Sequence, residues 1–302
     1  MRVRRNVRQL GERSMKRSFA DTDKGQIYFY EQGEGPVLIL LHPSPQSGRV
    51  YWRLAPELAH TFRVIVPDTL GFGLSDPLPP DATMPDLADC TAQLMDIAGV
   101  DKANIFGFHT GNKIAAALAS DHPNRVDRLI LCGQTHSLVP DQSGRISAFG
   151  PITNRYFESK STEQNAGNAA HAHMQWATEA FADFSRFWWD KRAIETFGYT
   201  PDLRRYLSSR IMDSLQAKDS TTAIYSANFE FDFEAALRKI SSTTLIIEVA
   251  SAAEAHLGAQ AAPLATLMQD ASHATVEDGD REVLEMRTEE IRMLILKFLT
   301  RT

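Results

Sequence analysis

The chain has 302 residues, of which 43% are hydrophobic and 23% charged, and its formal net charge is −6 at pH 7. This composition is typical of a globular protein with a sizeable core, and it excludes a disordered or fibrous chain. The charge is unevenly distributed. Residues 1–17 hold seven Lys or Arg and one acid, a balance of +6, which leaves −12 for the rest. Such an acidic remainder argues against nucleic acid as a partner.

The basic N-terminal segment has no apolar stretch, so it does not match a secretory signal. We expect residues 1–20 to form a disordered tail, with a transit peptide or a true start at Met15 as the alternatives. No run of about 18 apolar residues occurs, so neither a membrane-spanning helix nor a membrane partner is expected. Cys90 and Cys132 are too few for a disulfide framework and lack metal-ligand spacing, which predicts reduced thiols and a cytoplasmic location.

Apolar runs of strand length alternate with helical stretches along the chain. An amphipathic helix is predicted at 288–299, and the candidate buried strands are 37–41, 62–67, 103–106, 127–132, 244–249 and 273–277. This alternation predicts an α/β fold whose doubly wound, mostly parallel sheet is covered by helices on both faces.

A long segment, 134–242, separates the fourth of these strands from the fifth. It has no strong strand pattern and is dense in helix formers and aromatic residues. We therefore predict one core domain, formed by 21–133 and 243–302, with a helical cap at 134–242. Most of the aromatic side chains of this segment are expected to form the core of the cap, and Trp188 is expected to line a ligand cavity.

The most informative motif is Gly107-Phe108-His109-Thr110-Gly111, which has the form of a nucleophile elbow with histidine in place of serine. In such an elbow a sharp turn joins a strand to a helix, and the two glycines let the backbone and the helix approach each other closely. The residue at the apex adopts a positive φ angle, which histidine tolerates better than most residues. The motif thus predicts a preserved turn in which the reactive atom has been exchanged.

Four segments together resemble the α/β-hydrolase superfamily, in the capped branch that contains haloalkane dehalogenases, epoxide hydrolases and carbon–carbon bond hydrolases. Residues 35–42 are similar to the strand that leads to a His-Gly turn in this family. Residues 68–76 match its D-x-x-G-x-G-x-S-D loop, which is a very specific motif, and 107–111 and 122–131 correspond to the elbow and the next strand. The resemblance covers roughly residues 24–300 and implies an α/β-hydrolase fold with a catalytic site under the cap.

The resemblance also implies positions for a catalytic acid and a catalytic histidine, and neither holds the expected residue. The acid position, three residues beyond the strand at 243–249, is Ala252, although Glu254 and Glu248 are close enough to supply a displaced acid. The histidine position, seven residues before Thr288, is Arg281, which stays protonated and cannot act as a general base in water. His273 is the alternative, but it precedes the last strand instead of following it.

Other residues are assigned by the same comparison. The oxyanion hole would use the N–H groups of Ser44 and Thr110, and Ser44 keeps its N–H although Pro43 before it has none. His42 is expected to brace the loop. Arg281, His136 and Trp188 are the candidate substrate-binding residues, with Arg281 suited to a carboxylate.

Three functions follow from these observations. The first is an enzyme that uses His109 as general base beside this oxyanion hole, in C–C cleavage, elimination, isomerisation or water addition on a small apolar or aromatic compound. The second is a non-catalytic protein that binds a small molecule in the capped pocket. The third is a hydrolase in which His109 activates water and Glu254 orients it. No cofactor or metal is expected, the partner is a small-molecule substrate, and a homodimer is left open.

Overall fold

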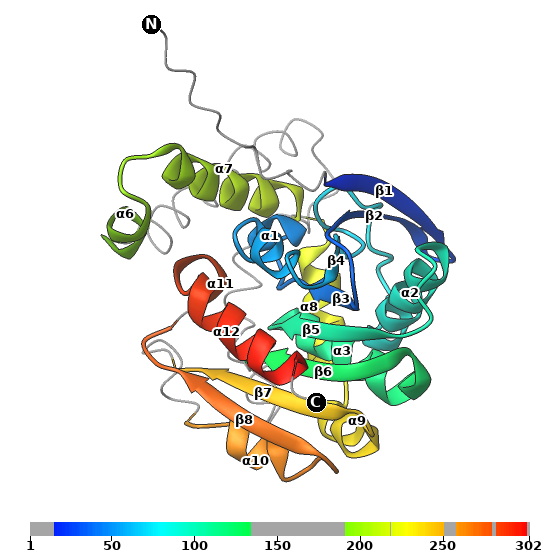
Figure 1. The fold of residues 1–302 in the computed structure, drawn as a ribbon. Helices are drawn as coiled ribbons and strands as arrows, with labels where there is room; N and C mark the ends of the chain where they lie inside the picture. Colours follow the sequence, from blue (N-terminus) through cyan, green and yellow to red (C-terminus); the bar gives the residue numbers. More distant parts are fainter. Residues whose placement is uncertain (1–14, 134–190, 218, 251–257, 280–281, 301–302) are drawn as a thin grey trace, which may run out of the picture.

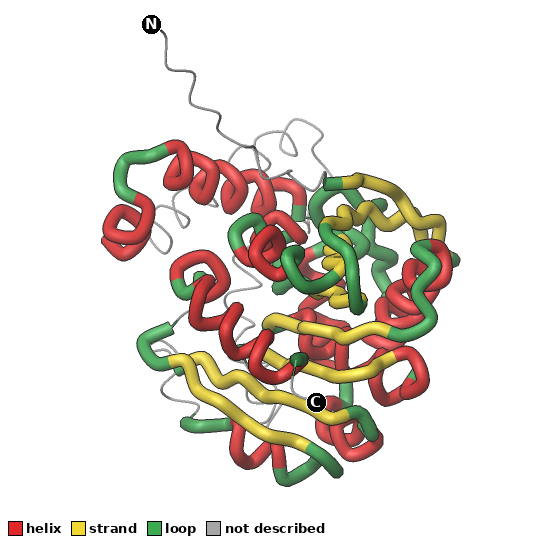
Figure 2. The backbone as a smooth tube through the Cα atoms, in the orientation of Figure 1, coloured by secondary structure: helices red, strands yellow, loops and turns green. Residues whose placement is uncertain are grey.

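The computed structural model describes residues 15–133, 191–217, 219–250, 258–279 and 282–300 (Figures 1 and 2). Eight strands of these ranges form one sheet in the order β1-β2-β4-β3-β5-β6-β7-β8. The pairs β1–β2 and β2–β4 are antiparallel and all the others are parallel, which confirms the predicted mostly parallel sheet. The strands are β1 Lys16–Thr22, β2 Gly25–Gln32, β3 Val37–Leu41, β4 Arg63–Pro67, β5 Ala103–Phe108, β6 Val126–Cys132, β7 Thr243–Val249 and β8 Ala271–Val276.

Helices cover both faces of the sheet because the central strands are apolar on both sides. In β3, for example, Ile39 and Leu41 belong to one hydrophobic cluster, whereas Leu38 and Leu40 belong to the other. The first cluster includes residues of α2 (Met84–Ile97), α3 (Thr110–Asp121), α8 (Thr221–Glu230), α9 (Phe233–Lys239) and α10 (Ala261–Ala265). The second includes residues of η1 (Gly48–Tyr51), α1 (Leu54–Leu58), α11 (Val283–Met286) and α12 (Thr288–Leu299) (Figure 1). A short helix, η2 (Pro123–Arg125), leads into β6.

The start of the sheet differs from the prediction. β1 begins at Lys16, inside the segment 1–20 that was expected to be a tail, and most of its side chains are exposed. An exposed edge strand has no apolar run, which is why hydrophobic periodicity did not reveal it. β1 and β8 are the two edge strands of the sheet.

The described part of the segment between β6 and β7, where the cap is expected, is helical. Helices α6 (Lys191–Phe197) and α7 (Pro201–Gln216) form a separate small cluster with Ala193, Phe197, Leu203 and Tyr206 at its centre. Helices α8 and α9, in contrast, contribute to the main core beside α3. The expected cap segment 134–242 therefore ends in two helices that pack with the core, and its residues 134–190 lie outside the described residues.

No helix within the described ranges is long and apolar enough to cross a membrane.

Candidate active site

The elbow motif forms a tight turn between β5 and α3. β5 ends at Phe108, α3 begins at Thr110, and His109 between them has φ 50° and ψ −110°. The positive φ expected for the apex is therefore confirmed. Few residues other than glycine adopt this conformation, so the turn is strained and depends on its surroundings to hold it.

The two glycines of the motif allow backbone segments to meet at the turn. A Cβ atom on Gly111 would lie 2.2 Å from the carbonyl oxygen of Leu41, and one on Gly107 would lie 2.5 Å from that of Gly111. Both distances are far below van der Waals contact, so larger residues at these positions require the backbone to move. The close approach of helix and strand that the motif predicts is thus present.

The imidazole of His109 lies against the ends of β5 and β6 and is partly exposed. Its ring meets the edge of Phe108 with centroids 4.2 Å apart and an interplanar angle of 89°. A Cβ atom on Gly133 would lie 3.1 Å from His109 Nε2, so the ring passes directly over the residue that follows β6. The apex side chain is therefore held at the carboxyl ends of the central parallel strands, where open α/β sheets bind their ligands.

Asn112 connects the first turn of α3 to the end of β6. Its side-chain nitrogen donates to the carbonyl oxygens of Cys132 and Gly133 at 2.9 Å each, and its side-chain oxygen accepts from Cys132 N at 2.9 Å. The backbone N–H of His109 also donates to Cys132 O, at 3.1 Å. These bonds hold β6 and the elbow together. The motif did not predict this role, although the position of Asn112, just past the second glycine, places it in the first turn of the helix.

Replacing Asn112 by alanine is expected to destabilise the protein by about 3 kcal/mol, because buried backbone groups of Cys132 and Gly133 lose their side-chain partner. Asn104→Ala is the matched control, since the buried Asn104 donates one side-chain hydrogen bond, to Val37 O. That variant should lose about 1 kcal/mol. Urea unfolding of both variants measures the difference, and equal losses would show that Asn112 has no special role.

The two expected oxyanion donors lie side by side. The Ser44 N–H donates to the hydroxyl oxygen of Thr110 at 3.4 Å, a long bond, while the Thr110 N–H makes no hydrogen bond within the described ranges. Thr110 is the first residue of α3, whose N-terminal N–H groups and dipole favour negative charge. The geometry brings together two backbone donors beside the apex of the elbow.

His42 braces the loop that carries Ser44, as expected. Its Nε2 accepts from the backbone N–H of Thr69 at 2.8 Å, so its Nδ1 carries the proton and donates to Pro43 O at 3.0 Å. Burial lowers the pKa of His42 to about 4, which keeps the ring neutral. Both ring nitrogens are used in this way, and His42 is structural.

The alternative acid and base residues can be placed in part. Glu248 accepts from the backbone N–H groups of Gln260 and Ala261 at 3.0 and 3.1 Å and thereby caps α10, so its oxygens are engaged in structure. His273 is exposed on the edge strand β8, three strand spacings or about 14 Å from β5, which removes it as a partner of His109. The remaining candidates, Glu254, Arg281, His136 and Trp188, lie outside the described residues.

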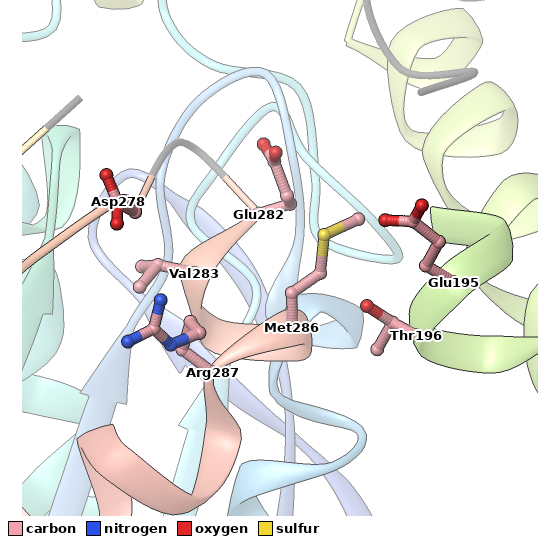
Figure 3. A pocket seen from close by; sticks show the side chains of 8 residues that line it. Glu195, Thr196, Asp278, Glu282, Val283, Met286 and Arg287 are labelled. Atoms are coloured by element: carbon pink, nitrogen blue, oxygen red, sulfur yellow. The ribbon is translucent and has the colours of Figure 1, made fainter. Parts of the chain in front are cut away.

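An open groove lies between α6 and the segment that follows β8 (Figure 3). Glu195 and Thr196 of α6 point toward Met286 of α11 across it, and Asp278 and Glu282 also line it. The guanidinium of Arg287, the cation of this lining, binds Glu290 at 2.6 Å. The described lining of the groove thus holds three carboxylates and one guanidinium. No group of three potential metal ligands occurs among the residues that the structure describes.

A buried charge cluster joins α7 to the core. The guanidinium of Arg210 pairs with the carboxylate of Glu285 on α11, and both side chains are almost fully buried. Burial raises the pKa of Glu285 to about 7, against the lowering effect of Arg210, and the nearby carboxylates of Glu282 and Asp213 raise it further. Because burial outweighs the attraction of Arg210, the Glu285 carboxyl retains its proton at higher pH than usual. No sequence motif indicated this pair.

Glu285 predicts a pH dependence of stability. Between its ordinary pKa of 4.5 and about 7, the folded state keeps the proton and the unfolded state loses it. Stability should therefore fall as pH rises through this window, by at most about 1.4 kcal/mol per pH unit, and level off above it. Unfolding by urea at pH 5 to 8 should show a smaller slope in Glu285→Gln, whereas Glu234→Gln, an exposed partner of Arg238, should keep the parent slope. Equal slopes of stability against pH in the parent protein and both variants would contradict the assignment of this pH dependence to Glu285.

The order of the strands, the strained elbow and the paired backbone donors define an α/β-hydrolase architecture. The family model described as alpha/beta hydrolase fold matches residues 36–240, more than half of the chain, and the chain belongs to this family. The predicted fold and resemblance are thus confirmed.

Individual relatives match shorter stretches. The chain is 36% identical over 126 residues to the 2-hydroxymuconate semialdehyde hydrolase of Pseudomonas sp. (strain CF600), covering 40% of this chain and 44% of that protein. It is 30% identical over 112 residues to haloalkane dehalogenase 2 of Mycobacterium tuberculosis (strain ATCC 25618 / H37Rv), covering 37% and 39%. The chain thus spans about two fifths of the length of these curated relatives.

Among solved structures, the enol-lactonase from Burkholderia xenovorans LB400 is similar with a TM-score of 0.71 and 18% identity, over 94% of this chain and all of that one (100%). At this identity the similarity concerns the fold alone.

Proposed function

We propose that the protein is an enzyme of the α/β-hydrolase fold in which His109 acts as a general base beside the N–H groups of Ser44 and Thr110. The substrate is a small apolar or aromatic compound, and the reaction is a C–C cleavage, lyase, isomerase or hydratase step. The observation that carries this proposal is the position of His109, held in a strained conformation at the apex of the elbow. The positive φ angle of His109 is informative because strained backbone conformations are concentrated at functional sites.

The surroundings of His109 suit a base that starts neutral. The positive end of the α3 dipole lies at the next residue and opposes a charge on the imidazole. The same dipole and the two N–H groups favour an oxyanion on a bound substrate. His109 and the two N–H groups are neighbours at the turn, which supports a role in proton transfer next to a carbonyl.

The chemistry can be written for an enol substrate. His109 accepts the proton of the enol hydroxyl and returns it to a carbon atom, while the Ser44 and Thr110 N–H groups hold the oxygen. In a hydrolytic C–C cleavage, His109 then takes a proton from water, the hydroxide adds to a carbonyl carbon, and the bond to the neighbouring carbon breaks. The departing enolate receives the proton. Serine is not needed in this sequence because water is the nucleophile.

The nature of the substrate is suggested by the 36% identical relative, whose name specifies 2-hydroxymuconate semialdehyde. Such a compound combines an enol hydroxyl, a carboxylate and an aldehyde in one conjugated chain. A related substrate would give His109 a proton to move and the oxyanion donors an oxygen to hold. We assign its carboxylate to Arg281 and its apolar part to Trp188 and His136, as the sequence predicts.

The direct test offers 2-hydroxymuconate semialdehyde and related enols to the parent protein and follows absorbance and product formation by NMR. His109→Ala should reduce kcat by about 10²- to 10⁴-fold, the usual contribution of a general base. His60→Ala is the matched control, because His60 is exposed and distant in sequence from the elbow, and its kcat should be unchanged. An unaltered rate in His109→Ala removes His109 from catalysis.

Binding is measured with the same compounds by calorimetry. If the parent protein binds these compounds tightly without turnover, the protein is a small-molecule-binding protein and the proposed enzymatic function is rejected. Neither the elbow glycines nor the oxyanion donors change in His109→Ala, so this variant should still bind.

A second prediction concerns ester hydrolysis. Since no serine stands at the elbow, turnover of p-nitrophenyl esters should be negligible and fluorophosphonates should label no residue of the site. His109→Ser should not create an efficient esterase, because a serine without a histidine partner is a weak nucleophile near neutral pH. Ester turnover without labelling would instead favour an ester hydrolase in which His109 activates water and Glu254 orients it, and labelling within the site would disprove the loss of a nucleophile.

A further inference from the structure

Helix α7 of the insertion contacts the loop that carries the expected oxyanion donor. This loop, residues 42–48, is called the oxyanion loop below. The carboxylate of Asp213 accepts from the backbone N–H of Ser47 at 3.2 Å and from its hydroxyl at 2.8 Å. It also accepts from Nε of Arg49 at 2.9 Å and from Nη2 at 2.7 Å. One side chain of α7 thus holds four donors from the start of η1 and the residue before it.

Among the described residues, the core holds the oxyanion loop at its two ends and, between them, by the long bond from the Ser44 N–H to Thr110. At the start, His42 accepts from the Thr69 N–H at 2.8 Å, and at the end the Gly48 N–H donates to the Asp68 carboxylate at 2.7 Å. Between these points Ser47 is completely buried, and Asp213 is the acceptor of its N–H in the described part of the chain. Without Asp213 this buried donor would be unpaired, at a cost that favours a different loop conformation.

Ser44 lies between the two anchored ends, three residues before Ser47, and its N–H points to Thr110 at the start of α3. Only Pro45 and the buried Gln46 separate Ser47 from this donor, so a shift of Ser47 is expected to move the donor as well. Helix α7 is itself fixed, because Arg210, one turn before Asp213 on the same face, pairs with Glu285 of α11. The position of the insertion and the direction of the Ser44 N–H are mechanically linked by these contacts.

We propose that Asp213 is a positioning residue, which holds the oxyanion loop through Ser47 so that the Ser44 N–H stays beside Thr110, where the proposed function places the substrate oxygen. This role rests on the proposed function of Ser44. Asp213 touches no reacting atom and acts through the loop. Arg49 balances its charge, so the carboxylate can accept both Ser47 bonds while buried.

The first arm of the test needs no substrate. Hydrogen exchange of the Ser44, Gln46 and Ser47 amides is measured by NMR in the parent protein, in Asp213→Asn and in Asp213→Ala. We expect roughly 10- to 100-fold faster exchange of these amides in both variants, the equivalent of one or two lost hydrogen bonds, with β5 amides unchanged. Asp202→Asn is the matched control, since Asp202 is an exposed residue of α7, and it should behave like the parent protein.

The second arm uses turnover of the substrate that the enol panel identifies. Asp213→Asn should lower kcat roughly 10- to 100-fold with little change in KM, since a misplaced oxyanion donor affects the transition state most. Ser47→Ala should lower kcat in the same way, and the double variant should lose little more than Asp213→Asn alone. Additive losses in the double variant overturn the route through Ser47.

The two arms separate the possible failures. If the Asp213 variants show faster loop exchange but the parent protein turns over no substrate, the link from Asp213 to the loop is supported and the proposed function is overturned. Unchanged loop exchange in folded Asp213 variants overturns the positioning role, whatever the activity. Where both Asp213 variants fail to fold, Ser47→Ala decides. It removes one of the two Ser47 bonds to Asp213, together with the bonds that the hydroxyl accepts from Arg49, and keeps the Arg49–Asp213 ion pair. Parent-like exchange in that variant rejects the proposal.

Discussion

The strained turn at His109 is the constraint on which the rest of the site depends. A positive φ at a non-glycine residue persists only where neighbouring contacts impose it, and here they come from the ends of β3 and β6. Gly111 lets α3 pass over the end of β3, Asn112 binds the end of β6, and the His109 N–H bonds to Cys132. Because these contacts join three adjacent strands, the apex side chain cannot move independently of the sheet centre.

The same turn explains why the site retains its electrostatic character although the apex residue differs from serine. The direction of α3 and the exposure of its first N–H groups depend on the backbone, and they are independent of the side chain at position 109. The oxyanion loop, in turn, is held by His42 and Asp68 from the core and by Asp213 from α7. In the proposed function, anion stabilisation therefore comes from the backbone of the scaffold, whereas proton transfer comes from the side chain of one residue.

Apolar runs in the sequence were sufficient to locate the central strands, since strands buried on both faces must be apolar throughout. β3 and α12 begin and end at the predicted residues, and the elbow geometry follows from its two glycines. β1 was missed because an exposed edge strand carries no such run. Asp213 and Glu285 could not be found from the sequence either, because a charged residue in a helix is normally solvated, and only the packing of α7 against the core buries them.

Glu248 shows where spacing arguments reach their limit. Counting from the end of a strand identifies residues near the site. Successive side chains of a strand, however, point to opposite faces of the sheet, so a residue at the right distance can face away from the site. Ile246 and Glu248 point to the face covered by α10, while Ile247 and Val249 point to the other. A carboxylate at position 248 is thus committed to the α10 amides, and an acid for His109 has to come from a loop beyond the strand. The family's fold is present in this chain, and in the proposed function the chemistry of the site rests on His109.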